Sequence, residues 1–229
     1  MSVEVQRMFA SIAPSYDRVN QVLSFGIHHR WRKRLLREAH LEAGARVLDC
    51  ATGTGDLAIA FARALGEGAE VVGTDFCAEM LESGPAKAAR AGVQVRFQVA
   101  DAMALPFEDD HFDAASISFG IRNVDDPVRA LQEMARVVRP GGKVMVLEFG
   151  QPRGLFGALY RFYSNSVIPT VGGLLSGNRA AYKYLPETSA AFPAGKAFVA
   201  LMERAGCYAS HRALPLTFGV AWVYEGVVR

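Results

Sequence analysis

The stretch Arg46–Asp56 reads RVLDCATGTGD and decides how the rest of this 229-residue chain is interpreted. Val47 and Leu48 favour a short buried strand, and Gly53 and Gly55 allow a tight turn whose backbone can approach a ligand closely. Apolar residues at helical spacing follow, so the pattern predicts a strand, a glycine-rich turn and the start of a helix. The free N–H groups at that helix start favour a polar or anionic ligand.

The turn alone leaves two cofactor classes open. Gly53-x-Gly55-x-x-Ala58 fits the dinucleotide fingerprint, and Asp75 follows at the distance expected of a ribose-binding acid. Asp49, however, precedes the turn, where its carboxylate would repel a pyrophosphate and attract the amino group of S-adenosylmethionine. A plain strand-to-helix turn in which this acid caps the helix is the structural alternative.

The composition of the chain favours some classes of protein and argues against others. Apolar residues make up 51% of the chain, enough for a buried core, and the net charge of +2 is too small to indicate nucleic-acid binding. Cys50, Cys77 and Cys207 are far apart, which argues against a zinc site or disulfide framework and suits a reducing cytosol. No run of 18 apolar residues predicts a transmembrane helix, and the first residues do not resemble a secretory signal.

Polar side chains stand where successive strands are expected to end. Asp49, Asp75, Asp101 and Ser118 each lie at or near the end of a predicted strand. Alternating strands and helices predict a parallel sheet, whose carboxyl ends meet at the edge where ligands bind. After the first strand, further strands are expected over residues 70–75, 95–99, 113–119 and 144–149. Helices are expected over 80–91 and 128–138, and a turn over 140–142.

The flanking segments predict a single domain with four parts: an N-terminal helical cap (1–40), a cofactor-binding core (41–150), a helical substrate cap (151–206) and a C-terminal hairpin (207–229). The first part carries a basic helix, which fits either a solvated face or contact with an anionic membrane. The third part is rich in aromatic residues, which fits either core packing or the lining of an apolar substrate site. The basic residues are Arg30, Arg32, Lys33, Arg34 and Arg37.

These patterns resemble the class I S-adenosylmethionine-dependent methyltransferases. The resemblance implies a Rossmann-like α/β fold with a mostly parallel seven-stranded sheet and a C-terminal antiparallel hairpin. In that family the first strand-end acid and the turn hold the methionine end, the second acid holds the ribose, and the pair after the third strand contacts the adenine. Ala51 departs from a usual glycine. The predicted cofactor residues are Asp49, Gly53, Thr54, Gly55, Asp75, Asp101, Ala102 and Ser118.

Three longer segments resemble one particular group of these methyltransferases. Tyr16–Trp31, Ser118–Val124 and Arg136–Glu148 look like signatures of the menaquinone/ubiquinone biosynthesis C-methyltransferases. That family's substrate is a reduced quinone with a polyprenyl tail, so the resemblance implies methylation of demethylmenaquinol to menaquinol, or of a ubiquinone-precursor quinol. Mild departures from the family pattern occur at Val19, Arg139 and Gly150.

The proposed chemistry assigns two catalytic residues. C-methylation needs an electron-rich ring carbon, which forms when the quinol hydroxyl loses its proton. Arg122 would stabilise the oxyanion and Asn123 would orient the hydroxyl or a water. The base stays open between water, His28 and Asp101. The structural alternative for Arg122 is a salt bridge to a nearby acid, Asp125 or Asp126.

Three rival functions are compatible with a fold of this kind. A dinucleotide-dependent oxidoreductase is disfavoured by Asp49 and by the C-terminal hairpin, and a nucleic-acid methyltransferase by the small net charge. A non-catalytic module that binds the cofactor is the third. No metal is expected. The prenyl tail implies a cytoplasmic protein that contacts the membrane peripherally through the basic helix or residues 151–185; a homodimer is compatible with the sequence, which does not determine the oligomeric state.

Overall fold

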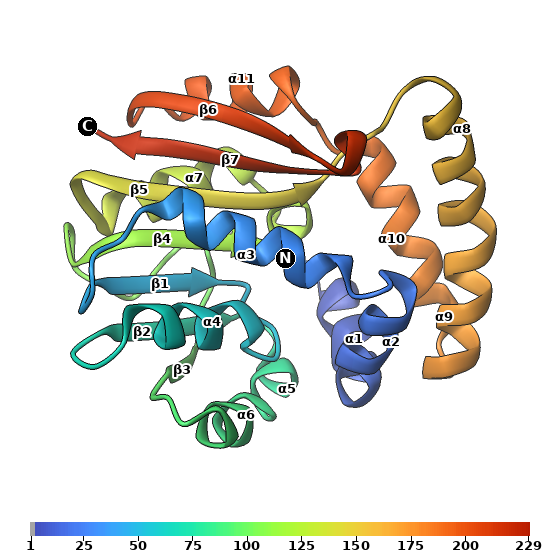
Figure 1. Ribbon diagram of the computed structural model, residues 1–229, viewed down its shortest axis with the longest axis horizontal. Helices are drawn as coiled ribbons and strands as arrows, with labels where there is room; N and C mark the ends of the chain where they lie inside the picture. The colour runs from blue at the N-terminus through green and yellow to red at the C-terminus, as the bar shows by residue number, and fades with distance from the viewer. Residues whose placement is uncertain (1–2) are drawn as a thin grey trace.

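A seven-stranded sheet forms the centre of the protein, for which the computed structural model describes residues 3–229 (Figure 1). The strand order is β3-β2-β1-β4-β5-β7-β6. The first five strands are parallel, and β7 pairs antiparallel with both β5 and β6, which confirms the predicted fold class. The strands are β1 (Arg46–Cys50), β2 (Glu70–Asp75), β3 (Arg96–Val99), β4 (Phe112–Ser118), β5 (Val138–Phe149), β6 (Tyr208–Leu216) and β7 (Ala221–Val228).

The order of the strands reverses beside β1, which lies between β2 and β4. Connections that leave in opposite directions open a crevice at the carboxyl ends of such strands, where ligands bind in sheets of this kind. Val47 and Leu48 in β1 are fully buried on opposite faces, as expected of a strand covered on both sides. The strand thus carries its terminal residues to the crevice on a rigid support.

Two layers of helices cover the sheet. α3 (Ile27–Ala39) and α4 (Asp56–Leu65) pack on one face, and α7 (Pro127–Arg136) and α11 (Lys196–Ala205) pack on the other. α5 (Ala78–Leu81) and α6 (Gly84–Ala91) follow β2, so the helix predicted over 80–91 is divided before Gly84 and Pro85. α11 contacts α7 and β6, and this part of the predicted 151–206 cap therefore packs on the sheet.

The predicted turn over 140–142 is wrong, because these residues lie inside β5. The register with β4 jumps from Phe112 opposite Val138 to Ala114 opposite Lys143, so four residues of β5 lie opposite one residue of β4 and the pairing is irregular here. Gly141 has a φ of +77°, a conformation that glycine adopts without steric cost. The glycine pair thus bends a continuing strand, which starts six residues before the expected position.

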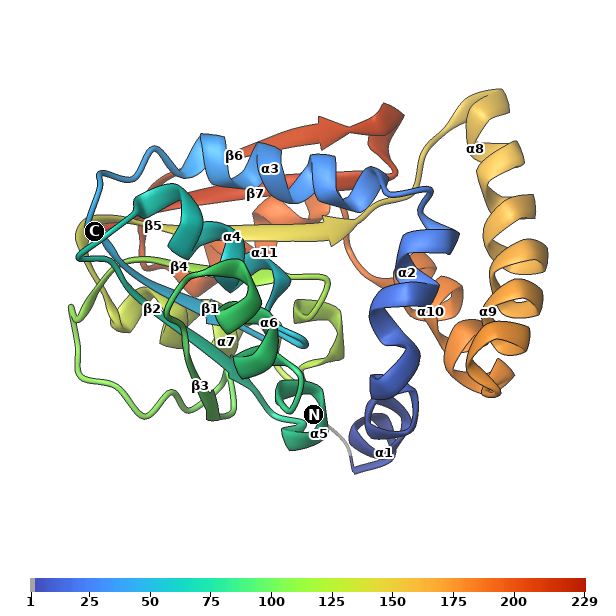
Figure 2. The same cartoon turned by 60° about the horizontal axis from the view of Figure 1, so that its bottom comes forward.

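A separate group of helices lies beyond the carboxyl ends of the parallel strands (Figures 1 and 2). This helical lobe contains α1 (Val3–Ile12), α2 (Tyr16–Leu23), α8 (Gly154–Phe162), α9 (Ile168–Ser176) and α10 (Arg179–Ala191). Segments from both ends of the chain meet in it, since the hydroxyl of Tyr163 donates to the carbonyl of Leu23 at 2.6 Å. Its small core contains Ile12, Val19, Leu23, Ile168, Ala181 and Tyr182.

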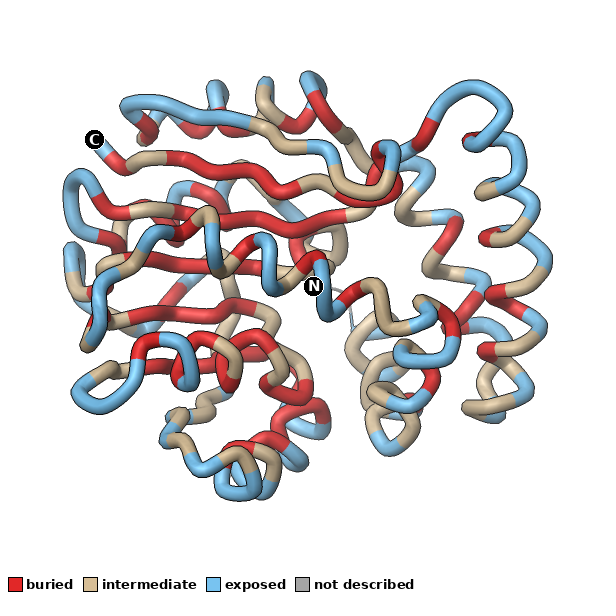
Figure 3. The backbone as a smooth tube through the Cα atoms, in the orientation of Figure 1, coloured by how far each residue is buried: buried red, intermediate tan, exposed pale blue. Residues whose placement is uncertain are grey.

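Burial differs between the sheet and the helical lobe. Figure 3 shows buried residues along most of the central strands, whereas the lobe has them mainly where its helices meet. The lobe packs closely at Gly172, where an added Cβ would lie 2.4 Å from the Tyr182 ring. The helical lobe therefore has a smaller buried core than the sheet, and it covers the edge of the sheet where ligands bind.

Candidate functional site

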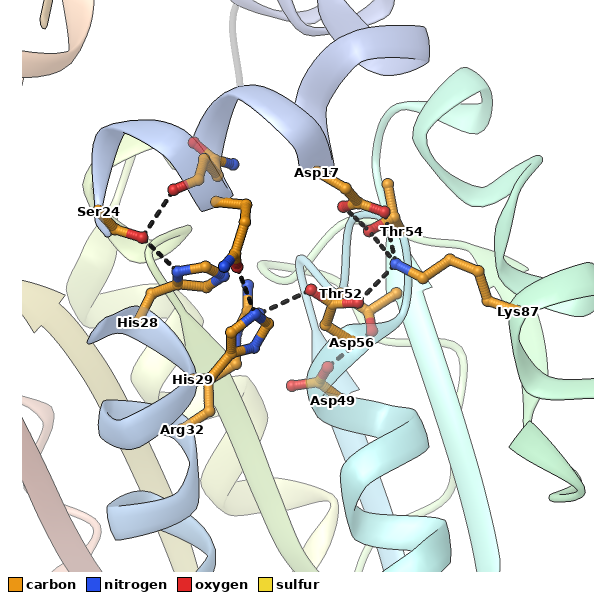
Figure 4. A network of polar contacts seen from close by, with 12 residues as sticks. Asp17, Ser24, His28, His29, Arg32, Asp49, Thr52, Thr54, Asp56 and Lys87 are labelled. Atoms are coloured by element: carbon orange, nitrogen blue, oxygen red, sulfur yellow. Dashed lines mark hydrogen bonds and ion pairs between the residues drawn. The ribbon is translucent and has the colours of Figure 1, made fainter. Parts of the chain in front are cut away.

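Asp49 lies beneath the glycine-rich turn (Figure 4). Its two carboxylate oxygens accept hydrogen bonds from the hydroxyls of Thr52 and Ser116, both at 2.6 Å. Burial raises the pKa of this carboxyl to about 6, although the two hydrogen bonds oppose the shift. Asp49 is thus placed to fix the shape of the turn, and its side chain does not line the cleft above.

The turn itself is strained at one position. Ala51 has a φ of +47°, in the left-handed region that disfavours residues with a Cβ. Its Cβ also faces Gly120, where a second Cβ would approach to 2.4 Å. The alanine that replaces the family's usual glycine therefore adopts a conformation that glycine would adopt more easily.

A small cleft opens above the turn, and Asp75 lies in its wall. The carboxylate of Asp75 accepts from the backbone N–H groups of Gly53 and Cys77, each at 2.9 Å. Burial raises its pKa, and the backbone hydrogen bonds oppose this shift. This cofactor cleft brings together five of the predicted residues: Gly53, Asp75, Asp101, Ala102 and Ser118.

The other three predicted cofactor residues do not line the cleft. Asp49 lies below the turn, and the hydroxyl of Thr54 donates to Asp17 of α2 at 2.6 Å. Gly55 packs against Phe97, so closely that an added Cβ would lie 2.7 Å from the ring. The sequence pattern thus combined residues that face the cleft with residues that shape the turn from behind.

A charged network joins the helical lobe to the rim of the cleft (Figure 4). The ammonium of Lys87 contacts the carboxylates of Asp17 at 2.6 Å and of Asp56, and donates to the Thr54 hydroxyl at 2.9 Å. Arg32 of α3 pairs with the other oxygen of Asp56 at 2.7 Å. Sequence reasoning missed Lys87, because no local pattern shows that α6 brings it to this point.

The cleft is narrow, with a volume of about 60 Å³. Ligand pockets usually enclose roughly 300–1,000 Å³, so a nucleoside cofactor needs more room than this. Phe9 and Tyr16 of the helical lobe and Met80 of α5 occupy its walls. Cofactor binding therefore requires these side chains to move apart, and the network around Lys87 holds the segment that carries the first two.

A much larger cavity of about 770 Å³ lies beside the cleft, between the N-terminal helices and α8–α10. Phe9, Tyr16 and Phe119 border both spaces, so the cavity and the cleft are neighbours across these rings. The lining is mostly apolar and aromatic, which suits a flat ring with a hydrocarbon chain. It includes Phe25, Trp31, Phe149, Phe156, Leu159 and Leu185.

Arg122 lies in the wall of this large cavity. Its guanidinium donates to the carboxylate of Glu148 at 2.8 Å and to the carbonyl of Phe119 at 2.7 Å. It also lies 5.4 Å from the ring centre of Phe149. The alternative interpretation of Arg122, a salt bridge to Asp125 or Asp126, is wrong, because Arg122 pairs with Glu148, which is distant in sequence. Asp126 instead caps α7, where its carboxylate accepts hydrogen bonds from two backbone N–H groups.

Asn123 faces the cofactor cleft, on the other side of the boundary from its neighbour. Its side-chain oxygen accepts from the hydroxyl of Tyr184, which lines the large cavity, at 3.0 Å. Burial raises the pKa of Tyr184, so the phenol stays protonated and donates. The adjacent residues Arg122 and Asn123 therefore contribute to the two spaces separately, where a cofactor and an acceptor would meet.

The two candidate bases lie in different spaces. His28 lines the large cavity, and its Nδ1 contacts the hydroxyl of Ser24. Burial lowers the pKa of His28 to about 4, and the charges of Arg32 and His29 lower it further, so the ring is neutral at pH 7. Asp101 lines the cleft. Its carboxylate accepts from the N–H of Met103 at 2.9 Å.

Comparison with known proteins places the chain among methyltransferases. The sequence profile of the ubiE/COQ5 methyltransferase family matches residues 1–228. The "Ubiquinone/menaquinone biosynthesis C-methyltransferase UbiE" of Bdellovibrio bacteriovorus is 54% identical, over 98% of this chain and 96% of its own. The "Demethylmenaquinone methyltransferase" of Thermus thermophilus is 51% identical, over 96% of this chain and 99% of its own.

Solved structures share the fold at low sequence identity. A "SAM-dependent methyltransferase, possible histamine N-methyltransferase" from Thermotoga maritima has a TM-score of 0.68 at 20% identity, over 97% of this chain and 99% of its own. A "SAM dependent methyltransferase" from Aquifex aeolicus has a TM-score of 0.65 at 18% identity, over 86% and 89%. These likenesses establish the fold alone.

Proposed function

This chain belongs to the ubiE/COQ5 methyltransferase family, and from that membership we propose that it C-methylates a prenylated quinol with S-adenosylmethionine. The preferred substrate is demethylmenaquinol, which becomes menaquinol, and a ubiquinone-precursor quinol is the second candidate, since relatives carry both names. One observation supports this most directly. A large apolar cavity adjoins the cofactor cleft, and Arg122 and Asn123 lie on either side of their boundary.

The cofactor residues have different roles in this proposal. Asp75 would accept from the ribose, Asp101 and Ala102 would contact the adenine, and the backbone at Gly53 would hold the methionine end. Asp49 acts from below, because its hydrogen bonds to Thr52 and Ser116 hold the turn in place. When bound, the cofactor supplies a methyl group already activated on a sulfonium.

The chain must then align the acceptor and raise the electron density of its ring carbon. A phenol has a pKa of about 10, so lowering it by ~2 units takes about 3 kcal/mol of favourable electrostatics. Hydrogen-bond donors aimed at a developing oxyanion in a dry site supply energies of this size. We assign this role to Arg122, whose side chain is only 4% exposed. Asn123, held by Tyr184, orients the hydroxyl or a water.

Peripheral contact with a membrane is part of the proposal, because the prenyl tail of the substrate resides there. Leu155, Leu159 and Phe162 of α8 are 91%, 65% and 65% exposed, at a spacing that puts them on one helix face. Phe25, 86% exposed, lies at the same side, where its ring approaches Tyr163. Phe25, Leu159 and Phe162 also line the large cavity, so this apolar face borders it.

Of the two surfaces considered for membrane contact, α8 is better supported than the basic helix α3. Two of the α3 arginines already pair with carboxylates, Arg32 with Asp56 and Arg34 with Glu38. α8 instead combines its apolar face with exposed Arg153 at its start. An amphipathic helix of this kind binds in the interface of anionic lipid. No helix within residues 3–229 is long and apolar enough to cross a bilayer.

Vesicle co-sedimentation tests the membrane contact. The triple variant Leu155→Ser, Leu159→Ser, Phe162→Ser should lose most binding to vesicles that contain anionic lipid, at low salt. Val99→Ser is the control, since Val99 is 54% exposed on the edge strand β3. Equal sedimentation of the triple variant and the control would refute α8 as the contact surface.

Mass spectrometry tests the reaction. The protein is incubated with S-adenosylmethionine carrying a labelled methyl group and with demethylmenaquinol, and labelled menaquinol is the expected product. Tight binding of S-adenosylhomocysteine without methylation of either quinol class would instead indicate a non-catalytic binding module. Tight binding of NADH with no binding of S-adenosylhomocysteine would refute the proposal in favour of a dinucleotide-dependent enzyme.

A further inference from the structure

Glu148 is a buried carboxylate at the end of β5, next to the proposed catalytic arginine. Its side chain is 1% exposed, and one oxygen accepts from Arg122 at 2.8 Å and from the backbone N–H of Phe149, also at 2.8 Å. It does not border the cofactor cleft or the large cavity. Any effect of Glu148 on the reaction must therefore pass through Arg122.

The pair is incompletely satisfied within the part of the chain described. The second oxygen of Glu148 and the Nε of Arg122 are both buried without a hydrogen-bond partner. A buried ion pair with unpaired atoms contributes little to stability, and apolar residues of similar volume often do as well. Stability alone is therefore a weak physical reason for this pair, whereas its position beside the acceptor cavity gives a stronger one.

The groups that face Arg122 from the surrounding helices are mainly neutral. Tyr16 of α2, Tyr160 of α8 and Tyr184 of α10 feel its charge, and burial raises the pKa of all three phenols. On α3, His28 is neutral at pH 7, because burial lowers its pKa to about 4.

The remaining charges on α3 are cationic. Arg30 and Arg32 also line the cavity, and Arg32 is paired with Asp56. The phenol of Tyr224 on β7 is also neutral, because burial raises its pKa and the charge of the nearby Glu148 carboxylate raises it further. Glu148 is therefore the carboxylate in direct contact with Arg122, inside a wall of neutral phenols and other cations.

We infer that Glu148 is a positioning residue for the methyl transfer: it fixes the guanidinium of Arg122 at the cavity wall and offsets its charge. The inference rests on the proposed function. Arg122 can then donate a hydrogen bond to the quinol oxygen without acting as a full, unbalanced positive charge. Glu148 in this way sets the pH above which the bound quinol ionises and reacts.

The variant Glu148→Gln separates charge from geometry. Its amide oxygen can still accept from Arg122 and from Phe149, so the guanidinium stays in place while the negative charge is lost. A unit charge about 8 Å away at an effective dielectric constant of ~20 shifts a pKa by roughly 1.5 units. We therefore expect the acidic limb of the turnover-versus-pH profile to move about 1.5 units lower, with unchanged binding of S-adenosylhomocysteine.

Two more variants make the test decisive. Glu148→Asp keeps the charge but is one methylene shorter, so turnover should fall about tenfold while the acidic limb stays where it is. Glu148→Ala should lose turnover at every pH. An unshifted limb in folded Glu148→Gln would overturn the inference, and so would wild-type turnover in Glu148→Asp, which decides the matter if the glutamine variant does not fold. Failure of the wild-type protein to methylate any quinol would instead overturn the proposed function.

Discussion

Replacing Arg122 by alanine should abolish most methyl transfer while cofactor binding persists. The side chain lines the acceptor cavity and lies outside the cofactor cleft, so S-adenosylhomocysteine should bind with wild-type affinity in calorimetry. Loss of a single donor to a developing oxyanion typically slows an enzyme by about 10²–10³-fold, or roughly 3–4 kcal/mol of transition-state energy. We expect turnover with labelled cofactor and demethylmenaquinol to fall by that factor.

The same substitution should also destabilise the protein, and the assay must separate this loss of stability from the loss of turnover. Arg122 and Glu148 are 4% and 1% exposed, so alanine leaves a buried carboxylate without its partner. Breaking a pair of this kind costs about 3–5 kcal/mol, a large part of the roughly 5–15 kcal/mol that stabilises a domain. For a chain of this length, the melting temperature should drop by about 6–20 °C.

A second variant distinguishes the two effects. Arg122→Ala combined with Glu148→Gln removes the unpaired buried charge, so most of the lost melting temperature should return while turnover stays low. Arg129→Ala is the matched control, because Arg129 is 55% exposed and its partner Glu133 keeps its ion pair with Arg136. Wild-type turnover in Arg122→Ala would refute the assigned role, and so would loss of S-adenosylhomocysteine binding in the stabilised double variant.

Three further predictions concern the network, the turn and the boundary between the two spaces. Lys87→Met should lower the unfolding free energy by roughly 1–3 kcal/mol and expose the N-terminal helices to protease, because it breaks several charge-assisted hydrogen bonds; Lys183→Met, at a 72% exposed side chain, should do neither. Burial raises the pKa of Asp49 to about 6, so between about pH 4 and pH 6 the folded state keeps a proton that the unfolded chain releases. The free energy of unfolding should therefore decrease as the pH rises from about 4 to about 6. Asp49→Asn should flatten that decline in denaturant titrations, and an unchanged slope would contradict the shift. Tyr184→Phe removes the hydrogen bond to Asn123 and should reduce turnover about tenfold with little change in melting temperature; unaltered turnover would show that this contact does not orient the acceptor.

The sequence predicted which strand-end residues would meet in one cleft, although their role in cofactor binding stays a prediction. Asp75, Asp101 and Ser118 lie together because parallel strands end at one edge of a sheet, a rule that needs only the order of strands and helices. The same reasoning could not tell that Asp49 and Thr54 point away from the cleft. Both side chains are held by partners from other segments, Ser116 and Asp17, and no local pattern encodes those contacts.

The cavity for the methyl acceptor was harder to predict from the sequence. Aromatic residues near 151–185 fitted either core packing or a substrate cap, and only the packed helices show that they enclose a cavity with N-terminal residues such as Phe25. The irregular start of β5 was also missed, because a glycine pair predicts a turn more strongly than a bend within a strand. In both cases the deciding contacts join segments far apart in the sequence.

By itself, the sequence determined the sheet, the glycine-rich turn and the family, since strand periodicity, turn chemistry and signature residues are local properties of the chain. The tertiary structure decided which side chains meet. Lys87 joins Asp17 to Asp56, and Arg122 finds Glu148, 26 residues away. A charged side chain that is buried in a medium of low dielectric constant costs free energy unless it is paired, and this cost favours such ion pairs. Burial itself depends on the fold of the whole chain, so a local sequence pattern does not predict the pairs.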